Sequence, residues 1–247
     1  MFGLGLLGVV AAVVVTRWQP WNSGTDSPPP PREDSTRFTP PVPASNALPA
    51  LPDPADGVAT LIEAGNDHLK AGAPEKAIAA YQRALKLNAE DEDIWFNLGI
   101  ANARLGNIDE AKRCYGESLR RLPDYPEVHT ALGNLEMSLR RLTNALDHYA
   151  AALELRPDDS VTLSQLGTCL AQMGKTDQAV TNFAEAVRLN PEYFEARFNL
   201  ASAQLRLGRY DQAIEEFERV LKMQPGFRPA LEGLDRAKTK MAAAKQP

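Results

Sequence analysis

Leucine, alanine and aromatic side chains return at fixed places between residues 58 and 227, where the chain divides into five successive segments of 34 residues. The segments are 58–91, 92–125, 126–159, 160–193 and 194–227. Position 8 of each segment holds glycine or alanine, position 20 alanine, position 24 tyrosine or phenylalanine, and position 32 proline in all but the first. Such a period indicates a repeat architecture in which each unit buries its apolar face against its neighbours.

Each segment is expected to fold as one helical hairpin. The small residues at positions 8 and 20 allow two helices to approach closely, and the aromatic side chain at position 24 fills the space beside them. Four segments carry glycine at position 15, which ends the first helix because glycine adopts a left-handed backbone at low cost. Proline at position 32 ends the second helix, since the residue before a proline avoids the helical region. The predicted fold class is all-α.

These columns resemble the tetratricopeptide repeat family, as in Trp95-Leu98-Gly99, Ala111, Tyr115 and Pro123 of the second segment. The resemblance implies a right-handed α-solenoid over residues 54–227, with first helices that line a concave groove for a protein or peptide. Residues 228–247 are predicted to form a capping helix and tail, because the last hairpin of a solenoid would otherwise expose its stacking face.

The chain before residue 54 has a different composition. Residues 1–18 are apolar apart from Arg17, and residues 19–53 are rich in proline. The first stretch predicts an N-terminal transmembrane helix, although it is marginal against the roughly 20 apolar residues that a span needs. A cleaved signal, which would give a secreted or periplasmic protein, is the alternative, and one arginine leaves the orientation open. The second stretch predicts a flexible spacer.

Composition and motifs argue against catalysis, cofactors and nucleic acid. The net charge is −5, which is not the basic footprint of a nucleic-acid binder. The two cysteines and three histidines are scattered over different segments without metal-ligand spacing. Gly3, Gly5 and Gly8 have the spacing of a dinucleotide fingerprint but lack the strand that must precede it. We therefore expect a non-enzymatic protein with neither cofactor nor metal.

The family resemblance places positions 2, 5, 6, 9, 12 and 13 of each first helix on the groove. Amides recur there, and an amide can pair with the backbone of an extended peptide without reading its side chains. The alternative is that these amides only keep the groove soluble. Phe96 and Phe198 are expected to project into the groove as contact sites, with burial against the neighbouring segment as the alternative. The predicted partner-binding residues are Asn66, Phe96, Asn97, Arg104, Asn134, Gln165, Phe198, Asn199 and Arg206.

A narrower family function is not supported by the sequence. Family members that bind chaperone tails clamp a terminal carboxylate with lysine, arginine and asparagine at set positions. The corresponding residues here are Ile62, Asn66, Asn97, Glu127 and Ala131, of which only the asparagines match. The resulting prediction is a membrane-tethered adaptor or scaffold that binds a protein or peptide. The alternatives are an accessory subunit that presents substrates to a partner enzyme, and a structural solenoid that self-assembles, for example as a homodimer.

Overall fold

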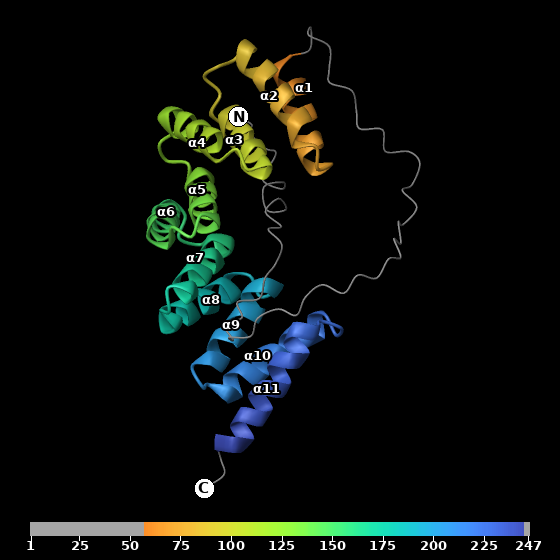
Figure 1. Cartoon of the computed structure of the whole chain (residues 1–247), viewed down its shortest axis with the longest axis vertical. Coiled ribbons are helices and arrows are strands. Elements are labelled where there is room, and N and C mark those ends of the chain that lie inside the picture. Colours follow the sequence, from red (N-terminus) through yellow and green to blue (C-terminus); the bar gives the residue numbers. More distant parts are fainter. Residues whose placement is uncertain (1–56, 245–247) are drawn as a thin grey trace, which may run out of the picture.

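The computed structural model describes residues 57–244, and this range contains eleven α-helices and no β-strand (Figure 1). The all-α prediction is therefore confirmed. The predicted anchor at residues 1–18 and spacer at residues 19–53 lie outside the described residues. None of the helices within residues 57–244 combines the length and the apolar composition that a membrane crossing requires.

Ten of these helices pair into hairpins, and one more follows at the C-terminal end. The pairs are α1 (Val58–Lys70) with α2 (Pro74–Leu87), α3 (Glu92–Leu105) with α4 (Ile108–Arg121), α5 (Pro126–Ser138) with α6 (Leu142–Leu155), α7 (Ser160–Gln172) with α8 (Thr176–Leu189), and α9 (Phe194–Arg206) with α10 (Tyr210–Met223), before α11 (Arg228–Ala244). The first helix of each hairpin begins at the first residue of a 34-residue segment.

The turn between the two helices of a hairpin uses a left-handed residue. Gly106 takes φ 77° immediately after α3, and its amide donates to carbonyl groups in the last turn of that helix. Arg140 occupies the same place after α5 with φ 60°, and it is the one non-glycine residue with positive φ in the described range. The turn geometry is thus kept where the sequence departs from glycine, at some conformational cost to Arg140.

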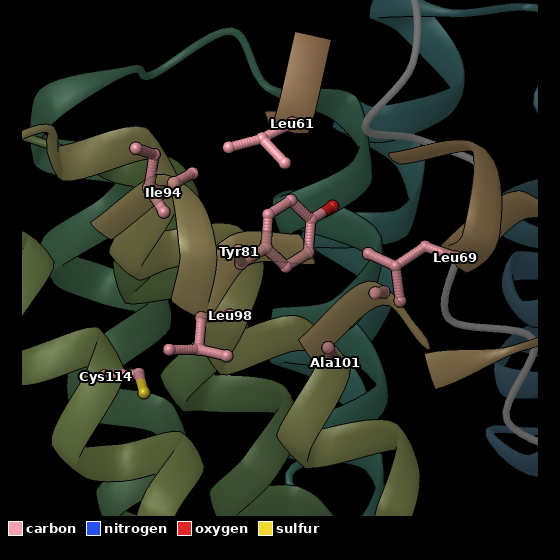
Figure 2. Close-up of a cluster of buried hydrophobic side chains, with 9 residues drawn as sticks. Leu61, Leu69, Tyr81, Ile94, Leu98, Ala101 and Cys114 are labelled. Carbon is pink, nitrogen blue, oxygen red and sulfur yellow. The ribbon is translucent and has the colours of Figure 1, made fainter. Parts of the chain in front are cut away.

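Close helix approach explains the glycine at position 8. A Cβ atom added to Gly65 would lie 2.4 Å from Cε1 of Tyr81, which is far inside van der Waals contact. The same relation holds for Gly99 with Tyr115, Gly133 with Tyr149, and Gly167 with Phe183. Figure 2 shows the Tyr81 ring enclosed by leucines of α1 and α3. The aromatic ring at position 24 therefore joins the two helices of its own hairpin to the next one.

The hairpins stack into a curved array that runs from α1 to α11 (Figure 1). Each first helix contacts the first helix of the next hairpin, and α9 contacts α11 in the same way. Consecutive second helices show no comparable contact among the described residues. The first helices are therefore the inner layer of the curve, and their exposed faces form the concave groove.

Candidate functional site, the concave groove

Two groove asparagines are held by tyrosines of the same hairpin. The hydroxyl of Tyr81 donates to Oδ1 of Asn66, and the hydroxyl of Tyr149 donates to Oδ1 of Asn134, both at 2.7 Å. Burial raises the pKa of both tyrosines above the ordinary value, so each hydroxyl keeps the proton that it donates. The Nδ2 group of each asparagine is left without a hydrogen-bond partner in residues 57–244, so it can donate to a ligand.

Asn66 and Asn134 stand at position 9 of their segments, and the other three first helices carry an amide at position 6 instead. Asn97 and Asn199 are half-buried on α3 and α9, and within the described chain neither forms a side-chain hydrogen bond. Oε1 of Gln165 on α7 is buried without a hydrogen-bond partner. This buried oxygen is out of a ligand's reach, but the Nε2 group of Gln165 forms no hydrogen bond within the described residues and can donate to a ligand. Each of the five first helices thus presents one amide with unused hydrogen-bonding capacity.

The expectation that Phe96 and Phe198 project into water is wrong. Phe96 is 3% exposed, and its ring centroid lies 5.3 Å from that of Tyr125. Phe198 is 5% exposed, and its ring centroid lies 5.3 Å from that of Phe227. The covering rings both stand at position 34, where the chain turns into the next first helix, so they lie over position 5 of their own segment. Phe96 also packs in a cluster with Val128 of α5, and Phe198 in a cluster with Ala230 of α11, so the alternative of burial against the neighbouring segment holds.

The two predicted arginines differ in their surroundings. Arg104 is half-buried, and its guanidinium donates to the carbonyl oxygen of Leu69 at the end of α1. This bond pairs a carbonyl in the last turn of one helix, which also accepts from the Gly72 amide, with a cation from the next hairpin, which favours the stacked arrangement. Arg206 is exposed at the end of α9. Partial burial of each guanidinium lowers the pKa of both arginines, which remain charged because the ordinary pKa of arginine is very high.

A hollow of about 410 Å³ lies at the C-terminal end of the groove. Its lining includes Asn199 and Arg206, which the sequence predicted, together with Glu232, Arg236 and Lys240 of α11, which it did not. The sequence signal for α11 was present, because this helix begins at residue 228, one 34-residue period after α9. Glu232, Arg236 and Lys240 then fall at positions 5, 9 and 13, which face the groove. The capping helix therefore also serves as a groove helix.

Side chains with catalytic or metal-binding chemistry are poorly placed for either. Cys114 and Cys169 are buried free thiols, and burial raises the pKa of Cys114 to about 12, so that it stays protonated at neutral pH. The hairpin brings His129 and His148 together, with ring centroids 6.0 Å apart, a pairing that their sequence spacing had not indicated. Within residues 57–244, no group of three or more histidine, cysteine or acidic residues could hold a metal ion.

The groove and its layered helices define a class of protein, the α-solenoid that presents a concave surface. Three sequence models of the tetratricopeptide repeat match residues 68–135, 124–192 and 165–226, which together run without a gap from 68 to 226. The chain is therefore a tetratricopeptide repeat protein over these residues. An uncharacterised protein of Methanocaldococcus jannaschii is 36% identical over 58 residues, which are 24% of this chain and 63% of that protein. The chain thus spans less than two thirds of the length of this curated relative.

Solved structures share the fold at low sequence identity. YrrB, described as a TPR protein with an unusual peptide-binding site, is 24% identical with a TM-score of 0.56, over 71% of this chain and 90% of YrrB. PilF of Pseudomonas aeruginosa is 21% identical with a TM-score of 0.65, over 76% of this chain and 90% of PilF. MamA of Desulfovibrio magneticus RS-1 is 20% identical with a TM-score of 0.60, over 72% of this chain and 99% of MamA. At these identities, the likeness establishes the fold alone.

Proposed function

We propose that this protein is a non-enzymatic adaptor that binds an extended segment of a partner protein in its concave groove, and that residues 1–18 tether it to a membrane. The observation that carries the groove proposal is the set of amides with unused hydrogen-bonding groups, one on each first helix. Two of them, Asn66 and Asn134, have their orientation fixed by tyrosine hydroxyls. YrrB, which shares the fold, is described as having a peptide-binding site, and this supports a peptide ligand for the present chain.

The spacing of the amides fits an extended ligand. Packed helices lie about 8 to 10 Å apart, and an extended peptide advances about 3.3 Å per residue. Successive amides would therefore meet every third residue of a bound peptide. An amide donates to carbonyl groups and accepts from N–H groups, so contacts of this kind hold the ligand backbone and leave its side chains to be read elsewhere.

The tether rests on composition alone. Residues 1–18 carry one charged side chain, Arg17, and the tryptophans at positions 18 and 21 suit a membrane interface. The proline-rich residues 19–53 then act as a spacer between the bilayer and the solenoid. Fractionation of cells that express the full chain tests this arrangement. We expect the chain in the alkali-resistant membrane fraction and its release when residues 1–18 are deleted, and recovery of the full chain as a soluble protein would overturn the tether.

A photoreactive residue placed in the full chain tests the groove. Asn97 lies in the groove on α3, whereas Gln82 is exposed on the outer helix α2 and provides the matched control. We expect a defined adduct from position 97 and none from position 82. The adduct should be lost in a second variant that carries Asn134→Ala, on the next helix of the inner layer. Equal labelling from both positions, or an adduct that survives Asn134→Ala unchanged, would contradict the proposal.

A further inference from the structure

The hollow at the C-terminal end of the groove combines an apolar floor with a polar rim. Leu205 of α9, Tyr210 of α10 and Pro229 of α11 are half-buried and contribute apolar surface to its lining, whereas Phe198 and Phe217 lie beneath it and are at most 5% exposed. Its volume of about 410 Å³ lies within the range of small ligand pockets. The floor suits one large apolar side chain, because such a group removes the apolar surface of the lining from water.

The rim of the hollow is cationic. Arg206 stands at the end of α9, and Arg236 and Lys240 stand one turn apart on α11. Neither Arg236 nor Lys240 forms an ion pair with any residue in the described part of the chain. Since like charges four residues apart on a helix repel each other, this pair is unfavourable in the absence of an anion.

The lining holds one carboxylate against three cations. Glu232 lies 3.8 Å from Arg228, a cation outside the hollow, and stands four residues before Arg236, so its single charge leaves the rim net positive. The remaining lysine of the same stretch, Lys238, pairs with Glu218 of α10 at 3.3 Å. The whole chain carries a net charge of −5, so the concentration of cations at this rim is not a consequence of composition.

We propose that this hollow binds an acidic stretch of the extended peptide, in which one large apolar side chain stands beside two or more aspartate or glutamate side chains. The inference rests on the proposed function and names the chemistry of its ligand. The apolar side chain fills the floor, the Asn199 amide holds the backbone, and the carboxylates meet the three cations. Arg236 and Lys240 stand one turn apart on α11 and Arg206 lies on α9, so the rim presents three positive charges, which match more than one carboxylate.

Fluorescence anisotropy with the full chain and synthetic peptides tests the inference. The probe is a labelled peptide of about ten residues, blocked at both ends, with a central phenylalanine flanked on each side by acidic residues. One control peptide replaces the acids by their amides, and another replaces phenylalanine by alanine. We expect the acidic peptide to bind about tenfold more tightly than its amide form, and this preference to shrink as salt is raised.

Variants of the rim assign the effect to α11. Arg236→Gln and Lys240→Gln should each weaken binding of the acidic peptide about fivefold, because each removes one partly exposed charge pair. Lys238 lies between them on the same helix but outside the hollow, so Lys238→Gln should leave the affinity for the acidic peptide unchanged. All three side chains are exposed, so circular dichroism should show unaltered folding.

The outcomes separate this inference from the proposed function. Equal affinity for the acidic and amide peptides, or unchanged affinity in both rim variants, overturns the inference. If the groove position 97 still gives its adduct in that case, the peptide-binding function stands without it. A peptide with a free C-terminal carboxylate and no acidic side chain that binds more tightly than the blocked acidic peptide also overturns the assignment to side-chain carboxylates.

Discussion

The same substitution in two helices should change stability in opposite directions. Gly133 lies in α5, where an added Cβ would stand 2.5 Å from Cε1 of Tyr149. Gly116 lies in α4, exposed, and an added Cβ there would meet nothing within 4 Å. Both residues are helix-interior glycines, so Gly133→Ala and Gly116→Ala remove the same backbone freedom and differ in packing alone.

The magnitudes follow from this difference. Alanine in place of glycine inside a helix is worth about 0.5 to 1 kcal/mol, and Gly116→Ala should gain this amount. Gly133→Ala gains it too, but its new methyl group must push the Tyr149 ring about 1 Å away, and overpacking of this kind costs about 1 to 3 kcal/mol. Moving the ring also disturbs its hydrogen bond to Asn134. The two variants should therefore differ by about 1 to 3 kcal/mol, with Gly133→Ala the less stable.

Native-state hydrogen exchange measures this difference locally, which matters because repeat arrays need not unfold in a single step. Amides of α5 and α6 should exchange faster in Gly133→Ala, whereas amides of α4 should exchange more slowly in Gly116→Ala. If Gly133→Ala protects α5 as well as Gly116→Ala protects α4, the helices of the hairpin are not held at the distance that the ring contact requires. The explanation of the glycine column would then be refuted.

Three further substitutions test individual contacts. Tyr149→Phe removes one hydroxyl hydrogen bond to a groove amide, so urea denaturation should show a loss of about 1 kcal/mol. Burial lowers the pKa of His68, so as the pH falls the histidine takes up a proton in the unfolded chain before it does in the folded one. The stability that is present above about pH 6.5 should therefore be lost as the pH falls. His68→Leu should flatten this dependence in urea midpoints measured between about pH 7 and pH 5. Arg197→Met leaves the buried carboxylate of Glu216 with Arg219 alone and should cost about 3 kcal/mol by urea denaturation, whereas Arg219→Met at the exposed side should cost less than about 1 kcal/mol.

The sequence was sufficient for the fold because the repeat columns record local packing rules. Glycine or alanine at position 8 and an aromatic residue at position 24 are a matched pair within one hairpin, and five copies of the pair leave little freedom for another arrangement. The first helices begin where the period places them, even after Asn88-Ala89, where the proline column is interrupted. Redundancy among the copies therefore compensates for single departures such as Arg140.

Side-chain exposure was less predictable because it depends on residues outside each column. Phe96 and Phe198 face the groove side by register, but Tyr125 and Phe227 cover them from the turn that follows each second helix. Tyrosine or phenylalanine at position 34 of these two segments was a visible signal for this burial. The register of Arg104 likewise predicts a cation in the groove, yet its guanidinium donates to a carbonyl of the preceding hairpin. This contact joins two neighbouring hairpins, and one segment considered alone does not contain it.

The last helix shows why a cap in a solenoid cannot be identified by polarity alone. A capping helix must bury one face against the last hairpin, and α11 does so with Ala230 and Ala237, while Gly233 lies so close to Phe217 that an added Cβ would stand 2.4 Å from the ring. Its remaining faces are solvated, so polar residues there are expected whether or not they have a function. Register separates the two cases, because Arg236 and Lys240 occupy groove positions of the 34-residue period and Lys238 does not. A helix that is polar for solubility alone has no reason to leave Arg236 and Lys240 unpaired on the groove side while Lys238, on the other side, pairs with Glu218.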